Sequence, residues 1–225
     1  MPAELPPSRY DFEVDIPPHS GDFVIGGADL APATLVDAYR HGFFPMGMSE
    51  GGAPPMGWWS PSPRGVLLHG DHHVSRSLRR SRPQFEITVD AAFDEVVAGC
   101  ADPSRSGAWI TDTIAQAYGR LHALGRAHSI EVWSKHGDLV GGLYGVSVGG
   151  LFSGESMFHR VTDGSKVALW AAVDLVFDDA GENRLFDVQW QTPHLARQGV
   201  RSVSRERYRA LLETALLQRP PAGFV

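Results

Sequence analysis

Two polar side chains interrupt an otherwise apolar segment at residues 184–192, RLFDVQWQT. In a β-strand alternate residues face the same side, so Asp187 and Gln189 would lie side by side. A carboxylate and an amide in such a strand raise the free energy of the fold unless they are hydrogen-bonded or used in chemistry. The pair therefore indicates either a structural polar network or part of a site.

A third polar group ends another apolar run. Glu155, within the sequence GES, follows the strand-like residues 150–153. Carboxylates and amides at strand ends commonly build a site at the edge of a sheet. We therefore treat Glu155 together with Asp187 and Gln189 as one candidate group.

The segment from His72 to Phe85 carries four arginines and no acidic residue. On a helix Arg76, Arg79 and Arg80 would share one face, with Arg82 off it. Guanidinium groups without counter-charges suit phosphate oxygens, so the cluster indicates either nucleic-acid contact or a solvated helix face.

The sequence lacks the usual motifs of a serine nucleophile, a metal site and a phosphate-binding loop, or has them in the wrong structural context. Residues 145–149 match G-x-S-x-G, but that nucleophile motif needs a strand-to-helix turn, and here a second strand follows. The glycines are better explained by a bulge or close backbone approach. The chain has ten histidines but no H-E-x-x-H motif, so we expect no metal. It also has no phosphate-binding glycine loop.

Composition limits the class of protein. The chain has 225 residues, and its single cysteine, Cys100, excludes an internal disulfide framework. A net charge of −6 argues against general nucleic-acid coating but permits a local basic patch. No apolar run is long enough to span a membrane, and the Pro-rich, acidic start lacks signal-peptide features. We therefore expect a cytoplasmic protein.

The pattern of turn residues and apolar periodicity predicts an α+β fold with a mixed sheet. In the first half it predicts helices over 32–41, 75–82 and, with Asp90 as cap, up to Cys100, strands over 65–69 and 84–89, and no regular element over 42–64. In the second half it predicts helices over 112–124 (capped by Thr111), 165–180 and 204–217, and strands over 128–134, 138–148, 150–156 and 184–191. We expect an N-terminal extension over 1–24, draped over the surface or partly disordered, a small α/β domain over 25–105, and a second domain over 106–225.

Eight segments, in this order along the chain, closely resemble the leucyl/phenylalanyl-tRNA–protein transferase family. They are GADLAPATLVDAYRHGFFP, WWSPSPRGVL, HVSRSLRR, WITDTIAQAYGRLHALGRAHSIEVW, LVGGLYGV, FSGESMF, SKVALWA and DVQWQTPHLARQG. Together they cover most of residues 24–205.

The resemblance implies an activity. The family moves Leu or Phe, and also Met, from tRNA onto the α-amine of proteins that begin with Lys or Arg, which marks them for the bacterial N-degron pathway. It implies a small N-terminal α/β domain followed by a GNAT-like acyltransferase domain. Because the aminoacyl ester is already activated, no cofactor or metal is expected. The partners are aminoacyl-tRNA and acceptor proteins, with no membrane.

The resemblance also assigns residues. Asp187 and Gln189 match the family's catalytic pair, in which Asp187 would hold and help deprotonate the acceptor ammonium while Gln189 orients the ester; Glu155 would position acceptor and ribose. The matches to the apolar pocket for the transferred side chain are Leu143, Phe152, Met157, Leu169 and Phe186. The matches to tRNA-binding residues are Arg76, Arg79, Arg80, Arg82, Tyr39, Trp109 and Tyr118, of which Trp109 and Tyr118 would lie near the terminal adenosine.

Four departures from the family pattern stand out. Val188 replaces a Cys between Asp187 and Gln189, with a side chain expected to point away from the pair. Ala31 replaces a Ser that caps the first helix, a loss that Asp29 could offset. Met46 replaces a Trp, and residues 48–57 form a looser loop.

Two alternatives remain. A CoA-dependent GNAT acetyltransferase would need an [RQ]-x-x-G-x-[GA] loop, which the sequence lacks. A non-catalytic RNA-binding module would retain all of its function without Asp187.

Overall fold

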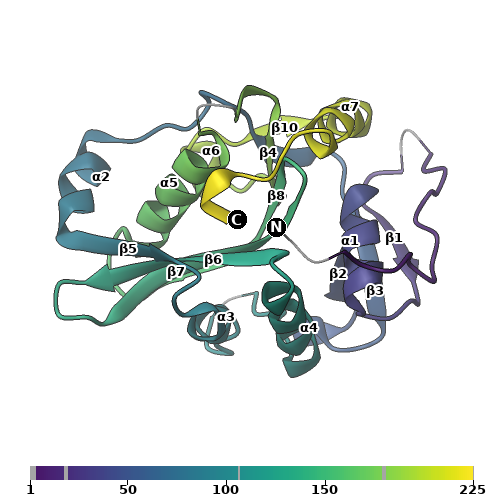
Figure 1. The fold of residues 1–225 in the computed structure, drawn as a ribbon, viewed down its shortest axis with the longest axis horizontal. Helices are drawn as coiled ribbons and strands as arrows, with labels where there is room; N and C mark the ends of the chain where they lie inside the picture. The colour runs from purple at the N-terminus through teal and green to yellow at the C-terminus, as the bar shows by residue number, and fades with distance from the viewer. Residues whose placement is uncertain (1–3, 18–19, 106, 179–180, 225) are drawn as a thin grey trace.

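The computed structural model describes residues 4–17, 20–105, 107–178 and 181–224, which form a small and a large sheet (Figure 1). Some expected segments lie partly outside the described residues. These parts are residues 1–3 and 18–19 of the N-terminal extension, residue 106 at the start of the second domain, and residues 179–180 of the helix expected over 165–180. The small antiparallel sheet has the order β1-β3-β2 and consists of β1 (Phe23–Gly26), β2 (Phe44–Gly47) and β3 (Met56–Ser60). Helix α1 (Pro32–Arg40) connects β1 to β2.

The expectation that residues 42–64 form no regular element is wrong, because β2 and β3 pair as a hairpin within that segment. Pro45 is tolerated because β2 is an edge strand. The glycines and the other prolines lie largely in the connection, which includes the 3₁₀ turn η1 (Glu50–Gly52).

The large sheet has seven strands in the order β10-β4-β9-β8-β7-β6-β5. They are β4 (Arg64–Leu67), β5 (Phe85–Val89), β6 (Ala127–Ser134), β7 (Leu139–Val148), β8 (Leu151–His159), β9 (Leu185–Gln189) and β10 (Arg201–Val203). Only the pair of β8 and β9 is parallel. Because β4 and β5 belong to this sheet, the boundary expected near residue 105 does not separate the two sheets.

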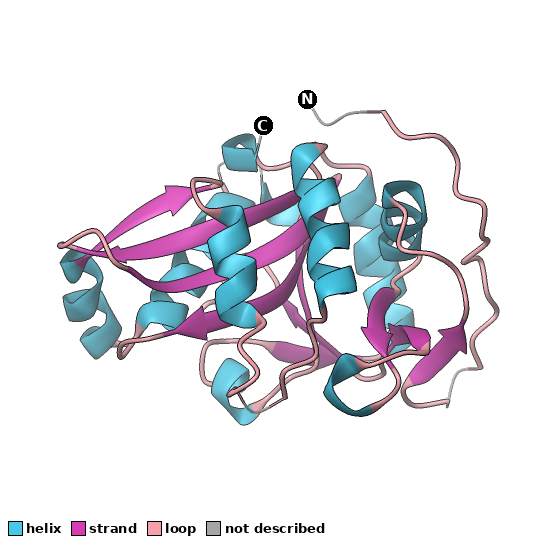
Figure 2. Ribbon diagram, turned by 90° about the horizontal axis from the view of Figure 1, so that it is seen from below, coloured by secondary structure: helices cyan, strands magenta, loops and turns pink. Residues whose placement is uncertain are grey.

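Helices cover both faces of the large sheet (Figures 1 and 2). Helix α5 (Gly164–Val176) packs on one face, and α3 (Phe93–Cys100) and α4 (Asp112–Ala123) pack on the other. Two adjacent glycines of β7 show how closely helices α5 and α3 approach the sheet. A Cβ on Gly141 would lie 2.8 Å from the backbone of Gly164 in α5, and one on Gly142 would lie 2.9 Å from Val96 in α3.

The remaining helical elements are short, apart from the C-terminal helix. They are α2 (Arg76–Ser81), α6 (Pro193–Ala196), α7 (Arg205–Leu216), η2 (Arg82–Gln84), η3 (Gly181–Asn183) and η4 (Ala222–Phe224). The expected cap Thr111 accepts a backbone N–H of α4, and Ser204 does the same for α7.

The expected cap of α3 is absent, whereas α1 lacks a Ser cap as expected. Asp90 does not cap α3, because its carboxylate accepts the N–H of Ser129 and bonds the imidazole of His128. Ala31 begins α1 without a side-chain cap, and Asp29 compensates by accepting from the Ala31 N–H and the Thr34 hydroxyl. These two bonds hold the pKa of Asp29 below its usual value.

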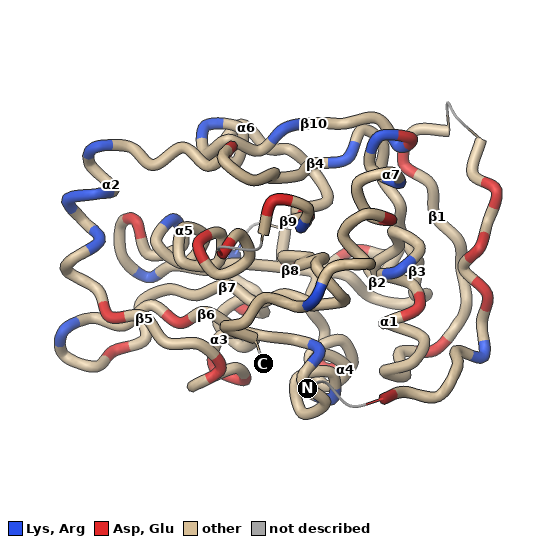
Figure 3. Tube along the Cα trace, turned by 45° about the horizontal axis from the view of Figure 1, so that its top comes forward, with Lys and Arg blue, Asp and Glu red and all other residues tan. Residues whose placement is uncertain are grey.

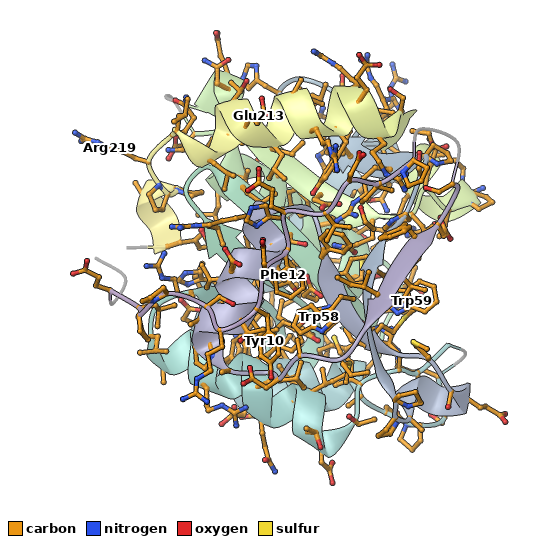
Figure 4. The ribbon with its side chains drawn as sticks, turned by 90° about the vertical axis from the view of Figure 1, so that its right-hand side faces the viewer. Tyr10, Phe12, Trp58, Trp59, Glu213 and Arg219 are labelled. Carbon is orange, nitrogen blue, oxygen red and sulfur yellow. The ribbon has the colours of Figure 1, made fainter. Side chains whose placement is uncertain are left out.

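The described part of the N-terminal segment packs onto the small sheet. The ring of Phe12 lies edge-on to Trp58 with centroids 4.9 Å apart, and both side chains are buried (Figure 4). Ile16 is buried as well. This segment therefore contributes to the core that holds β3 in place.

Residues 145–149 do not form a nucleophile elbow. Ser147 is buried in β7 opposite Phe152 of β8, and the register shifts between Tyr144 and Gly145 as in a β-bulge. Within the described residues, no group of His, Cys, Asp or Glu is arranged to hold a metal ion. None of the described helices has the length and apolar character required to cross a membrane.

Candidate active site

A cavity of about 140 Å³ lies where β8 and β9 stop pairing. The two strands pair from Leu151–Leu185 to Ser153–Asp187, and the residues that follow line the cavity. The lining residues are Leu143, Gly154, Glu155, Ser156, Met157, Leu169, Phe186, Val188, Gln189 and Leu195. Most of these side chains are apolar, with Gln189 and Glu155 among the polar exceptions.

A row of hydrogen bonds joins the two polar residues. Gln189 Nε2 donates to Ser153 Oγ over 2.8 Å, and Ser153 Oγ donates to Glu155 Oε1 over 3.0 Å. The hydroxyl of Tyr118 donates to Glu155 Oε2 over 2.8 Å and lies 2.7 Å from the hydroxyl of Tyr39.

The carboxyl of Glu155 titrates near neutrality. Burial raises its pKa to about 7, against the opposing effect of the hydroxyl groups that donate to it. A carboxyl with this pKa exchanges a proton readily at physiological pH, which suits a general base.

Asp187 lies behind the cavity and does not line it. Both of its oxygens are occupied. Arg64 Nη2 donates to Oδ2 over 2.6 Å and Arg64 Nε to Oδ1 over 2.9 Å, while Tyr208 donates to Oδ2 and the Gln189 N–H to Oδ1. The structure therefore does not bring Asp187 to the place where we expected it to hold an ammonium group.

The bond from the Gln189 N–H to Asp187 shapes the end of β9. Gln189 has a φ of 58°, a left-handed conformation that a non-glycine residue adopts only when its surroundings enforce it. This turn presents both Val188 and Gln189 to the cavity. Val188, whose side chain we expected to point away from Asp187 and Gln189, lines the cavity together with Gln189, whereas Asp187 does not.

Of the five side chains expected to form the apolar pocket, four line the cavity: Leu143, Met157, Leu169 and Phe186. Phe152 does not. It is fully buried and packs against Phe186 at a centroid distance of 5.1 Å. Leu195 of α6 lines the cavity in addition.

Comparison with known proteins identifies the family. The model for the leucyl/phenylalanyl-tRNA protein transferase matches residues 66–213, and the model for the N-terminal domain of that transferase matches residues 28–62. The chain belongs to the leucyl/phenylalanyl-tRNA–protein transferase family. The members of this family are aminoacyltransferases. The boundary between the two matched regions lies where the chain leaves the small sheet and enters β4 of the large sheet.

Relatives with this name are similar over most of their length. One from Oleidesulfovibrio alaskensis is 47% identical over 212 residues, covering 90% of this chain and 83% of the relative. One from Stutzerimonas stutzeri is 47% identical over 201 residues, covering 88% and 86%, and one from Escherichia coli is 44% identical over 200 residues, covering 88% and 83%.

Solved structures overlap more loosely. A GCN5-related N-acetyltransferase from Kribbella flavida gives a TM-score of 0.40 at 12% identity, covering 73% of this chain and 58% of that structure. L-PGS from Bacillus licheniformis gives 0.42 at 10% identity, covering 69% and 65%.

In this family member, the residues expected to bind tRNA fall into two groups. Arg76, Arg79 and Arg80 are exposed on α2, and Arg82, half-buried, begins η2. Trp109 is half-buried. In contrast, Tyr39 and Tyr118 are buried and bonded to the Glu155 network, so their hydroxyl groups support the site from inside.

Sequence reasoning did not single out three residues that build the site: Arg64, Ser153 and Tyr208. Arg64 carried a usable signal, because a lone cation at the start of the apolar run GVLL needs a buried partner. Ser153 and Tyr208 carried none, since each is ordinary in its strand or helix.

Proposed function

We propose that this protein transfers Leu or Phe, and also Met, from aminoacyl-tRNA to the α-amine of proteins that begin with Lys or Arg, marking them for N-degron degradation in the cytoplasm. Family membership supports the reaction class. The observation that carries the proposal is the apolar cavity between the separating strands β8 and β9, with Gln189 and Glu155 in its lining.

The cavity suits an unbranched-Cβ apolar side chain. Leu143, Leu169 and Met157 offer aliphatic and thioether contacts, and Phe186 offers an aromatic wall. Pockets of this kind bind chiefly by apolar contact and take their orientation from a few polar groups. Here the candidate polar groups are the Gln189 amide and the Glu155 carboxylate.

The chemistry requires removal of one proton before attack. An α-amine with a pKa of about 8 is mainly protonated at neutral pH. In the proposed reaction Glu155 accepts that proton, and the free amine attacks the ester carbonyl carbon. The new C–N bond forms, the bond to the ribose oxygen breaks, and a second amine proton goes to the leaving ribose oxygen. The proton on Glu155 is then released to water.

Gln189 acts in the proposed reaction at the ester. Because its Nε2 bonds Ser153 and its backbone conformation is held by Asp187, its side chain is fixed before the substrate arrives. Such preorganisation lowers the barrier to forming a charged intermediate. Asp187 and Arg64 are positioning residues in this account.

Helix α2 provides the complementary surface for the tRNA. Its exposed arginines suit the phosphates of the acceptor stem, and Arg79 also lies over the ring of Trp170 at 5.8 Å. Contacts of this type bind without reading sequence and weaken with salt.

The test is a transfer assay with a panel of donors and acceptors. The protein is mixed with Leu-, Phe-, Met- or Val-tRNA and a peptide beginning with Arg, Lys or Ala. We expect the Arg and Lys peptides to gain one Leu, Phe or Met. An Arg peptide with an acetylated α-amine is the control and gains nothing. No extension of any peptide, or modification that needs acetyl-CoA, would contradict the proposal.

A further inference from the structure

A second pocket borders α6 and shares no lining residue with the cavity. Its volume is about 190 Å³. Its polar lining residues are His73, Ser75, Lys166, His194, Arg197 and Gln198. They come from the start of α2, the first turn of α5, and α6 with the turn that follows it. None of the lining residues is acidic, so the pocket is suited to an anion.

The charge in this pocket comes from two cations. Arg197 is exposed, and among the described residues its side chain has no hydrogen-bond or ion-pair partner. Lys166 Nζ lies 2.6 Å from Asp163 Oδ1, but that carboxylate also accepts from the Ser81 hydroxyl and is outside the lining. The pKa of His194 is lowered, chiefly by burial and then by the charges of Lys166 and Arg197. The local field is therefore positive.

Gln198, which lines the pocket, has an unpaired polar atom. Its side chain is only 5% exposed, and its Nε2 lies 3.0 Å from His194 Nε2. Its Oε1 is buried and has no hydrogen-bond partner among the described residues. A buried carbonyl oxygen without a donor is costly, so a ligand that supplies a hydroxyl would stabilise it.

The position of the pocket connects the two surfaces already described. Ser75 and Leu78 belong to the arginine helix region, while Leu195 of α6 lines the cavity. Figure 3 shows basic residues on α2 and beside α6, at the upper left of the view. A strand of RNA that runs from the arginines to the cavity would pass this pocket.

We propose that the pocket binds one ribose-phosphate unit of the acceptor end of tRNA. Lys166 and Arg197 bind the phosphate, and Gln198 Oε1 accepts the ribose 2′-hydroxyl, the group that distinguishes RNA from DNA. The inference rests on the proposed function, because it takes aminoacyl-tRNA as the ligand.

The first test uses the unaltered protein. Binding of an acceptor-stem RNA minihelix carrying Leu through a stable 3′-amide is measured while single nucleotides near the 3′ end are replaced by their 2′-deoxy forms. We expect one replacement to weaken binding about two- to tenfold, the effect of one lost hydrogen bond. In Gln198→Leu, checked for folding by its thermal midpoint, that replacement has no further effect. Equal binding at every position overturns the assignment of Gln198.

The second test addresses the phosphate. Arg197→Ala should lower the slope of log affinity against log salt by about 1, the value for one lost contact. The matched control is Arg207→Ala on α7, an exposed arginine outside both pockets, which should leave the slope unchanged. Inorganic phosphate at constant ionic strength should compete with the minihelix more in the unaltered protein than in Arg197→Ala. An unchanged slope in Arg197→Ala overturns the phosphate site.

The outcomes separate this inference from the proposed function. Phosphate competition without any effect of 2′-deoxy replacement would mean a site for phosphate alone, contrary to the ribose assignment. Leucine transfer by the unaltered protein is measured in parallel. If that transfer is absent the proposed function fails, whereas the binding arms still decide the pocket.

Discussion

The guanidinium of Arg64 and the carboxylate of Asp187 form a buried ion pair, with Nη2 2.6 Å from Oδ2. Arg64 also stacks over the ring of Tyr208, whose hydroxyl donates to the same carboxylate. This cluster joins β4, β9 and α7 directly behind the cavity. Because both oxygens of Asp187 are occupied in this cluster, we propose that Asp187 serves to hold Gln189.

Asp187→Asn should therefore reduce the rate of transfer but leave the rate dependent on pH. The inflection should move to lower pH, because the charge of Asp187 helps to raise the pKa of Glu155. The substitution leaves Arg64 without a buried counter-charge, and we expect a loss of about 3 kcal/mol in the free energy of unfolding. Affinity for tRNA should barely change. Single-turnover rates across pH and denaturant unfolding measure these effects, with the exposed Asp94→Asn as control. A wild-type rate, or loss of the pH dependence, would contradict the positioning role.

Ser153→Ala should shift the pH dependence of transfer upward. The Ser153 hydroxyl donates to Glu155 and so lowers the pKa of that carboxyl; without the donor the pKa rises above its value of about 7. More base is then needed to ionise Glu155. Ser147→Ala, which removes another buried hydroxyl of the large sheet, is the control and should leave the inflection in place. An unshifted inflection in Ser153→Ala would separate Ser153 from the titrating group.

Met157→Ala should change the preference between the two donors. Removal of the thioether side chain enlarges the cavity, which favours Phe over Leu. In an apolar pocket, a methylene-sized change alters the free-energy difference between two competing substrates by about 1–3 kcal/mol. Competition between Phe-tRNA and Leu-tRNA measures it. Phe152→Leu, behind the cavity wall, should slow both donors equally, and an equal loss in Met157→Ala would place Met157 in the core instead.

Replacement of Arg79 and Arg80 by Ala should weaken tRNA binding and flatten its salt dependence. Each lost phosphate contact lowers the slope of log affinity against log salt by about 1. Kinetic constants for a 3′-aminoacyl adenosine, which lacks the acceptor stem, provide the comparison. An unchanged slope would mean that the arginines form a solvated helix face, the other interpretation of this cluster in the sequence.

Much of the fold could be predicted from local patterns. The strands over 128–134 and 138–148, the helix capped by Thr111 and the helix from Ser204 follow from alternation, periodicity and capping. The hairpin of β2 and β3 could not be predicted, because Pro45 is tolerated only in the edge strand β2 and the other prolines lie in the long turn.

The site could be predicted in its members but not in their roles. Asp187, Gln189 and Glu155 were visible as polar residues in apolar strands. Which of them faces the cavity depends on Arg64, 123 residues away in the chain, and on the left-handed turn at Gln189. Periodicity placed Tyr39 and Tyr118 on the apolar faces of their helices, where the structure buries them. It could not predict the bonds of their hydroxyl groups to one another and to Glu155.

We propose that the cavity with Glu155 in its lining carries out the transfer. The most direct measurement is the single-turnover rate of leucine transfer from Leu-tRNA to a peptide beginning with Arg, followed from pH 5.5 to pH 8.5 for the unaltered protein and Glu155→Gln. Because the pKa of Glu155 is raised to about 7, the carboxyl is neutral below that pH and becomes a base above it. We predict that the rate for the unaltered protein has an inflection near pH 7, and that Glu155→Gln is at least about tenfold slower and lacks this inflection, rising only as the amine loses its proton near pH 8. The same rate and the same inflection in Glu155→Gln, or no extended peptide at all, would contradict the account.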